Sequence, residues 1–364
     1  MQIERPFGDN NQAILCNVPP MLPGELFNQA IELKMSSGVE QRFGDFSISA
    51  FISRYLAGNS SLREARLVSR KRLALVASEV GYLDAQAVQL HQQIQRYQQA
   101  KQILIDSPVH TLDAICKLNG LIAPEQKGSG KLRQRQNWVG GKTPFIARYV
   151  CPPPEAVAAL MDNWLTFINA TSYSPEAIAI TGHCSLASIH PFSEGNGRTA
   201  RLFLDGMLEK THGDKVPLLT YRLSPACSGY IEAQELMNIG DPQSLSHPFW
   251  REAIAWSDQL QITFVDILSA CKKQLHSKIG MNRLSAASAK LLNRLWSQPI
   301  VCQRGLLTLF DMDINAVRLA LNELVKMGIL DSRKLRSPEN AVIYDCPIIF
   351  AAYTAMDDAI FVNV

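Results

Sequence analysis

The chain lacks a hydrophobic run long enough to cross a bilayer, and it lacks the charged, apolar and small-residue order with which a signal peptide begins. We therefore expect a cytoplasmic protein with no membrane partner. No Cys-x-x-Cys pair occurs among the eight cysteines, which argues against a zinc site and for reduced, structural thiols. The net charge is only +3, which is too small by itself to imply nucleic acid as a partner.

The 364 residues, 47% of them hydrophobic, exceed the usual size of a single domain and can fill more than one core. Apolar residues recur mostly at helical spacing, which predicts a mainly α protein. The predicted division has three parts: a helical region at 1–105, a core domain at 106–275 and a separate unit at 285–350. Residues 1–20 show no periodicity and contain three prolines, so we expect them to form a loose arm.

The most informative segment is residues 190–201, which read HPFSEGNGRTAR. Gly195 and Gly197 flank Asn196, and a glycine turn allows positive φ and close approach of the backbone to a ligand. The residues that follow are typical of a helix, so the turn lies at a helix N-terminus. Unpaired N–H groups and the helix dipole favour an anion there, and a diphosphate fits such a place.

Charged and titratable residues surround this turn. Arg198 and Arg201 are three residues apart, on one helical face, and both offer donors suited to phosphate oxygens. Glu194 would repel phosphate unless a cation stood between them, and Mg²⁺ is normally held by one or two carboxylates plus substrate phosphates. His190 precedes the turn and can accept a proton from an attacking hydroxyl near neutral pH. The segment therefore predicts a site for a nucleotide phosphate.

These twelve residues fill every fixed position of His-Pro-Phe-x-Asp/Glu-Gly-Asn-Gly-Arg-x-x-Arg, so the segment closely resembles the signature of the Fic (filamentation induced by cAMP) family. The resemblance implies an enzyme that moves a nucleoside monophosphate, most often AMP from ATP, onto a Ser, Thr or Tyr hydroxyl of a protein. It also implies residue roles: general base His190, Mg²⁺ ligand Glu194, loop anchor Phe192, nucleotide-binding turn Gly195, anion-hole donors Asn196 and Gly197, β-phosphate ligand Arg198 and γ-phosphate ligand Arg201. The alternative is a plain helix-capping turn with a core histidine.

A second segment, residues 130–154, resembles the β-hairpin flap that precedes the Fic core. The pair Gly140-Gly141 follows Trp138-Val139 and indicates a hairpin turn. An exposed hairpin edge can bind a target's main chain as an added strand and so present a side-chain hydroxyl. The flap also carries six basic residues with no acidic residue between them, which fit a solvated face or an acidic target: Lys127, Lys131, Arg133, Arg135, Lys142 and Arg148.

A third segment, residues 60–65 with the sequence SSLREA, resembles the family's inhibitory motif, Ser/Thr-x-x-x-Glu followed by Gly or Asn. The resemblance implies that Glu64 pairs with Arg201 and occupies the γ-phosphate position, so that ATP binds only in a pose unfit for transfer. Ala65 stands where the motif has Gly or Asn. A helix cap also explains the segment, because Ser61 as N-cap with Glu64 three residues later is a common helix start.

The C-terminal part predicts three helices followed by two strands, an order that resembles the winged helix of many Fic proteins. In such a module the third helix enters a major groove and the wing contacts phosphate. The third helix offers few side chains for reading bases: Asn315, Arg318 and Asn322 are expected to face outward, together with Glu323. DNA binding therefore stays open beside a role in dimerisation or target docking.

The predicted fold is mainly α: a Fic-type helical core with a small β-hairpin flap, plus a C-terminal winged helix-turn-helix. The predicted function is a protein adenylyltransferase that uses ATP and Mg²⁺, modifies a protein hydroxyl, its own included, and is inhibited by Glu64. A homodimer is a further candidate assembly. Two alternatives remain: transfer of another phosphate-containing group, and a DNA-binding regulator whose Fic core senses nucleotide.

Overall fold

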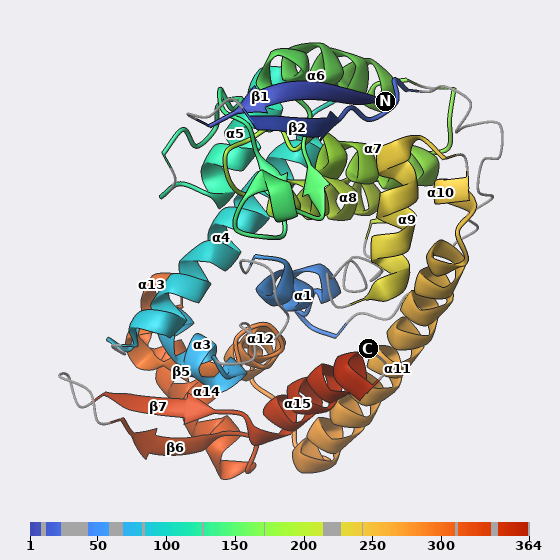
Figure 1. Ribbon diagram of the computed structural model, residues 1–364. Helices are drawn as coiled ribbons and strands as arrows, with labels where there is room; N and C mark the ends of the chain where they lie inside the picture. Colours follow the sequence, from blue (N-terminus) through green and yellow to red (C-terminus); the bar gives the residue numbers. More distant parts are fainter. Residues whose placement is uncertain are drawn as a thin grey trace. The chain divides into compact units, whose positions relative to one another are not determined.

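The computed structural model describes residues 1–8, 12–22, 43–57, 68–81, 84–125, 127–170, 172–213, 227–241, 243–309, 312–335 and 341–362. In these residues helices predominate, and the strands form three small antiparallel sheets, which confirms the mainly α prediction (Figure 1). The chain divides into two compact units. The first contains Met1–Ser36, Tyr55–Ser61 and Gln95–Ser257, and the second contains Ser37–Arg54, Leu62–Ile94 and Asp258–Val364. These borders differ from the predicted domain limits at 105 and 275.

The core of the first unit is a pair of helices, α7 (Pro175–Ile189) and α8 (Asn196–His212), which pack closely against each other. Gly182 of α7 permits this approach, because a Cβ there would lie 2.5 Å from the ring of Phe203. Three further helices pack on this pair or on one another: α5 (Leu112–Ile122), α6 (Pro154–Ile168) and α9 (Ser228–Ile239). The unit also contains α10 (Gln243–Ser246) and parts of α4 (Ala85–Asp106) and α11 (Pro248–Ile279).

Two hairpins complete the first unit. Strands β3 (Trp138–Val139) and β4 (Tyr149–Val150) form the expected flap, with a short 3₁₀ turn, Pro144–Ile146, between them. The prediction of a loose arm at residues 1–20 is wrong, because β1 (Gln2–Phe7) pairs antiparallel with β2 (Gln12–Asn17). One face of β2 carries Ile14 and Cys16, which are buried together with Val150 of the flap. This burial stabilises a pairing that the local sequence pattern does not indicate.

The second unit contains the expected C-terminal elements. Its helices α12 (Ala286–Leu295), α13 (Gln303–Leu309) and α14 (Ile314–Lys326) precede the hairpin β6 (Asp331–Lys334) and β7 (Val342–Asp345). Strand β5 (Ile300–Cys302) pairs with β7 and was not predicted, nor was the last helix, α15 (Pro347–Val362). The unit also includes α3 (Arg70–Ala77) and part of α1 (Ile48–Leu56).

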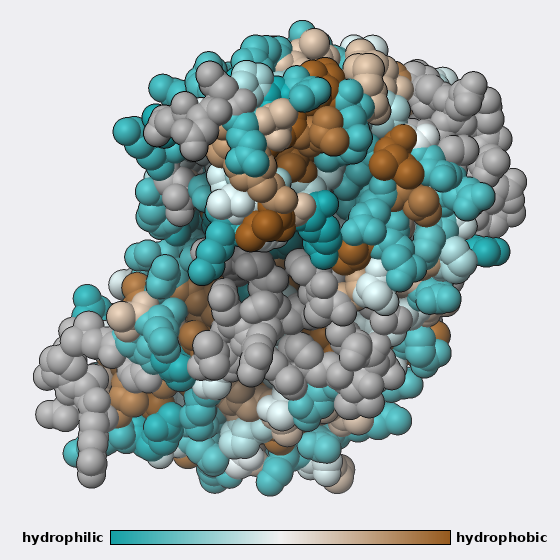
Figure 2. Space-filling model, in the orientation of Figure 1, coloured by the Kyte–Doolittle hydropathy of each residue, from teal (hydrophilic) through white to brown (hydrophobic). Residues whose placement is uncertain are grey.

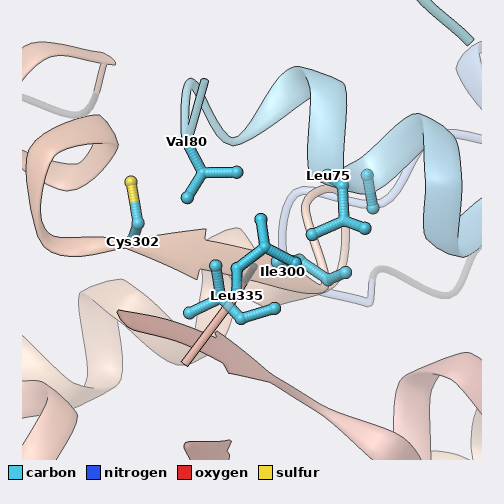
Figure 3. Packing of buried hydrophobic residues seen from close by; sticks show 7 residues of the cluster. Leu75, Val80, Ile300, Cys302 and Leu335 are labelled. Atoms are coloured by element: carbon cyan, nitrogen blue, oxygen red, sulfur yellow. The ribbon is translucent and has the colours of Figure 1, made fainter. Parts of the chain in front are cut away.

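Strand β5 joins the hairpin to a buried cluster of side chains. Leu75 of α3 and the nearby Val80 pack against Ile300 and Cys302 of β5 and against Leu335, which follows β6 (Figure 3). Ala74 and Ile343 belong to the same cluster. The predicted unit at 285–350 therefore shares its hydrophobic core with Ala74, Leu75 and Val80, more than 200 positions earlier in the chain.

One side chain of α14 departs from the prediction. Glu323 does not face outward with its neighbours, because its Oε2 accepts hydrogen bonds from the hydroxyls of Ser285 (2.7 Å) and Ser288 (2.5 Å) at the start of α12. These bonds lower the pKa of the Glu323 carboxyl. Asn315, Arg318 and Asn322 are exposed, as expected.

The face of the molecule in Figure 2 is mostly hydrophilic, with hydrophobic side chains gathered in small patches. Among the described helices, none combines the length and the apolar character needed to cross a membrane.

Candidate active site

The side chain of Asn196 holds the motif loop together. Its Oδ1 accepts a hydrogen bond from the Phe192 N–H (2.9 Å), and its Nδ2 donates to the Phe192 carbonyl (2.8 Å). The ring of Phe192 is fully buried, in keeping with an anchoring role. Because the Asn196 amide is buried and engaged within the loop, the backbone N–H of this residue is the donor better placed for an anion.

His190 ends α7 in the left-handed conformation, with φ 51° and ψ 54°. Its ring Nδ1 lies 3.3 Å from the carbonyl oxygen of Ala187, and a carbonyl only accepts, so we place the ring proton on Nδ1. Nε2 is then the basic nitrogen. Burial lowers the pKa of His190 to about 4, so the imidazole is neutral at pH 7 and can accept a proton.

The N-terminus of α8 has no side-chain cap. Helices α5 and α7 begin after Thr111 and Ser174, whose hydroxyls accept hydrogen bonds from first-turn N–H groups. Helix α8 begins after Gly195, which has no side chain to do so. Gly195 has φ 79°, and a Cβ there would lie 2.9 Å from Ala123, so both conformation and space require glycine. The first-turn N–H groups of α8 therefore suit an anion.

The two arginines of the motif have different surroundings. Arg198 is 8% exposed, and its Nη1 donates to the carbonyl of Ile122 at 2.5 Å. Arg201 makes no hydrogen bond or ion pair with the residues that the structure describes, and burial lowers the pKa of its guanidinium. Partial burial of a guanidinium with no carboxylate beside it raises the free energy of the folded protein, and a bound phosphate would offset that increase. Arg201 is therefore suited to receive an anion.

A pocket of about 180 Å³ brings part of the predicted site together. Its lining includes His190, Gly197 and Arg201 of the motif and Val139 of the flap. The rest of the lining comes from the flap, α7, α8 and α9: Arg148, Tyr149, His183, Ala187, Ala200, Tyr230, Ile231, Gln234, Glu235 and Asn238. Four predicted residues belong to the adjoining loop and helix start but not to this lining: Glu194, Gly195, Asn196 and Arg198.

His183 fixes one wall of this pocket. It is 1% exposed, its Nδ1 lies 2.9 Å from the Ala200 carbonyl, and its Nε2 accepts from the Tyr230 hydroxyl at 3.1 Å. Burial lowers the pKa of His183 to about 4, which keeps the ring neutral and permits this pattern. His183 is therefore a core residue, and it also orients Tyr230 at the pocket.

Asn119 of α5 is a residue that the sequence analysis missed. Its Nδ2 donates to the Glu194 carbonyl (3.0 Å) and to the Thr199 hydroxyl (3.2 Å), and its Oδ1 accepts from the Gly130 N–H (3.0 Å). One side chain thus connects the motif loop, α8 and the approach to the flap. A single asparagine within a helical pattern gives no local signal of such contacts.

The flap has the glycines that its turn requires. Gly140 and Gly141 have φ 73° and 77°, and a Cβ on Gly141 would lie 2.5 Å from the Ile146 carbonyl oxygen. Trp138 does not line the pocket, and its ring lies edge-on to Phe7 of β1, with ring centroids 5.7 Å apart. Of the flap residues predicted to dock a target, only Val139 reaches the pocket wall.

Glu194 is the predicted Mg²⁺ ligand, and its carboxylate is exposed at the motif loop. No group of three or more His, Cys, Asp or Glu side chains able to hold a metal occurs in the described ranges. A lone carboxylate fits Mg²⁺ when substrate phosphates supply further ligands, and the uncapped start of α8 is suited to those phosphates.

The predicted inhibitory residue, Glu64, lies outside the described residues, as does Ala65. Its pairing with Arg201 stays a prediction.

Comparison with known proteins agrees with the motif. Residues 109–208 match the model of the Fic/DOC family. The protein adenylyltransferase Fic of Drosophila virilis is 38% identical over 82 residues, which are 22% of this chain and 16% of that protein. The protein adenylyltransferase fic-1 of Caenorhabditis briggsae is 40% identical over 77 residues, 21% of this chain and 14% of that protein. The matches thus span about a sixth or less of these relatives' length.

Solved structures of Fic proteins are also similar. A Fic domain-containing signaling protein from Bacteroides thetaiotaomicron is 18% identical, with a TM-score of 0.45, over 58% of this chain and 86% of that chain. The family match covers the flap, α7, the motif loop and most of α8, which build the pocket together with α9, a helix outside the match. Residues 109–208 of this chain therefore form a Fic domain, of the Fic/DOC family.

Proposed function

We propose that the protein is an adenylyltransferase that moves AMP from ATP onto a hydroxyl group of a protein. One observation carries the proposal: at one pocket meet a neutral histidine with a free basic nitrogen, Gly197 of the uncapped first turn of α8, and Arg201, which has no partner among the described residues. Chemistry of this kind needs a base, an anion site and a cation for the leaving phosphates. The relatives named above are protein adenylyltransferases, which supports the same reaction class.

In the proposed reaction the hydroxyl oxygen attacks the α-phosphorus of ATP. Its proton passes to Nε2 of His190, a new P–O bond forms, and the bond to the β-phosphate breaks so that pyrophosphate leaves. The N–H groups at the start of α8 stabilise the charge on the phosphate oxygens, and Arg201 binds the terminal phosphate. Mg²⁺, held by Glu194 and the phosphates, would neutralise part of their charge.

The flap would place the target. Val139 lines the pocket, and a target segment added along the flap would bring a hydroxyl toward His190. Because such pairing uses main-chain hydrogen bonds, it places little demand on the target's sequence.

Intact-mass measurement of the purified Glu64→Gly protein, incubated with ATP and Mg²⁺, tests the proposal. We expect a gain of one AMP that disappears in the Glu64→Gly, His190→Ala double variant. The same incubation with other nucleoside triphosphates shows which nucleobase the site accepts. A gain with another nucleotide but not with ATP would replace adenylylation by a related transfer, and no gain with any nucleotide or added target protein would contradict the proposal.

Removal of the Glu64 charge should raise transfer, if this residue pairs with Arg201 as the inhibitory motif implies. Glu64→Gln is the sharper variant, since glutamine still serves a capping box but no longer neutralises the guanidinium. Ser61→Ala is the matched control, because it removes the N-cap and keeps the charge. We expect self-modification to rise in Glu64→Gln and Glu64→Gly and not in Ser61→Ala. A rise in Ser61→Ala alone would leave only the helix cap.

A second candidate function is DNA binding by the second unit. Glu323 is partly exposed and bonds to the start of α12, and the exposed side chains beside it on α14 include Asn315, Arg318, Asn322 and Lys326. A helix face of this composition suits a major groove.

Affinity for duplex DNA should then fall when Arg318 is replaced by alanine. Binding of the full chain measured between about 50 and 200 mM salt should weaken steeply for the wild type. The slope should decrease by about one unit in Arg318→Ala if this residue contacts phosphate. Leu319→Ala on the same face is the uncharged comparison. Equal, salt-insensitive binding by all three proteins would exclude this function.

A further inference from the structure

Arg133 is the most deeply buried basic residue of the flap. It is 2% exposed, although the flap's run of basic residues suggested a solvated face or an acidic target. Its neighbour Arg135 is exposed. The groups that shift the pKa of Arg133 include no carboxylate, and burial lowers this pKa. The guanidinium is therefore placed for a purpose other than surface charge.

The Arg133 guanidinium donates hydrogen bonds to four backbone carbonyls. Nε donates to His190 at 2.7 Å, and Nη2 donates to Pro152 at 2.6 Å and to Ile189 at 3.4 Å. Nη1 donates to Arg135 at 3.0 Å. A guanidinium offers five donors in a fixed plane and so can serve four carbonyls at once, whereas a lysine ammonium has only three donors.

Two of these carbonyls belong to the last turn of α7. Carbonyls at the end of a helix have no partner within the helix, and a cation there also interacts favourably with the helix dipole. His190 leaves the helix with positive φ and is followed by Pro191, so no continuing helix can satisfy these groups. Arg133 thus serves as the C-terminal cap of the helix that carries His190.

The backbone on either side of Arg133 also contacts the motif loop that begins at His190. Its N–H donates to the Pro191 carbonyl at 2.9 Å, and Leu132 forms an isolated β-bridge with Phe192. Asn137 donates through Nδ2 to the carbonyls of Phe192 (3.4 Å) and Ser193 (3.3 Å). The segment that leads into the flap therefore lies along the motif loop.

We propose that Arg133 is a positioning residue that fixes the direction of the His190 imidazole. It holds the carbonyls on which the left-handed turn at His190 depends, and through Pro152 and Arg135 it connects this turn to both ends of the flap. This role of Arg133 rests on the proposed function in one respect: the kinetic test measures AMP transfer. The direction of the ring itself can be measured without any transfer.

Three variants, each made in the Glu64→Gly protein, test the proposal by kinetics: Arg133→Met, Arg133→Lys and Arg135→Met. We expect kcat for AMP transfer to fall about 10- to 100-fold in Arg133→Met, since displacement of a catalytic group by about 1 Å has an effect of this size. Arg133→Lys keeps the charge but cannot serve four carbonyls, so it should restore only part of the rate. KM for ATP and direct ATP binding should stay within about twofold, because the anion site lies on α8.

Arg135→Met removes an exposed guanidinium from the same segment and measures the effect of flap charge alone. The loss of kcat should be confined to the Arg133 variants. If Arg135→Met loses as much, the effect comes from flap charge. If ATP affinity and the unfolding midpoint fall in step with kcat in both Arg133 variants, Arg133 only stabilises the domain. Each of these two results would overturn the proposal.

A transfer-independent readout is the NMR signal of the His190 ring Cε1–Hε1 group, assigned by its loss in His190→Ala. We expect this signal to shift in Arg133→Met and Arg133→Lys and to stay in place in Arg135→Met. An unshifted signal in folded Arg133 variants would show that the ring direction does not depend on Arg133. If the Glu64→Gly protein binds ATP but transfers nothing to itself or to any added protein, the proposed function fails while this signal still decides the role of Arg133.

Discussion

Replacement of His190 by alanine should abolish AMP transfer while ATP binding stays nearly unchanged. A general base contributes roughly 10² to 10⁴ to a rate, and its loss acts on the chemical step alone. The phosphate-binding groups lie elsewhere, at the start of α8 and on Arg201, and a smaller side chain at position 190 leaves them in place. The measurement, made in the Glu64→Gly protein with and without His190→Ala, pairs single-turnover transfer with direct binding of ATP.

An exposed histidine supplies the control. His276 lies in the last turn of α11 and is solvent-exposed, so His276→Ala should change neither transfer nor binding. Near-normal transfer by His190→Ala would show that another group accepts the proton. Loss of ATP binding together with transfer would instead make His190 part of the nucleotide site.

Lys101→Met should destabilise the first unit by about 3–5 kcal/mol, the usual effect of removing one partner of a buried ion pair. Lys101 of α4 is 4% exposed, and its Nζ lies 3.0 Å from Oδ2 of Asp205 and 2.7 Å from Oε2 of Glu209. Asp205 is fully buried, so the variant leaves its carboxylate with the Tyr97 hydroxyl at 3.1 Å as a remaining donor. The free energy of unfolding in urea measures the loss.

The double variant Lys101→Met, Asp205→Leu should recover most of that loss. Burial raises the pKa of the Asp205 carboxyl in spite of Lys101, so for this carboxylate desolvation outweighs attraction, whereas burial lowers the pKa of Lys101 by less than Asp205 and Glu209 together raise it. Apolar side chains of similar volume therefore replace such a pair at little cost. A double variant as unstable as Lys101→Met alone would mean that the pair itself, rather than the stranded carboxylate, is the source of the effect.

Local signals were sufficient for most helices of the first unit. The start of α7 follows from Ser174 and Pro175, because a hydroxyl acceptor and a proline both favour the first turn of a helix. The core face of α6 follows from its apolar spacing, and the structure buries Leu160 and Trp164 as that spacing predicts. A helix was expected to follow the glycine turn, and α8 begins at Asn196, so the turn itself enters the helix.

Non-local contacts account for the wrong or missed features. The hairpin of β1 and β2 depends on burial of Ile14 and Cys16 beside Val150, more than 130 residues later. Glu323 turns away from the exposed face of α14 because two serines at the start of α12 offer it hydrogen bonds. A pattern along one segment contains no information about such partners.

The sequence by itself determined the chemistry of the candidate site. The order of histidine, glutamate, glycines and arginines in residues 190–201 is sufficient to predict a base and an anion site, because each role depends on residue type and on spacing within one turn. Only the tertiary structure decided which side chains are free to act. In the folded chain the Asn196 side-chain amide forms hydrogen bonds within the loop, and Arg133 donates to the His190 carbonyl. Arg201 has no partner among the described residues. Burial removes water as a partner, and the groups that replace it come from distant parts of the chain.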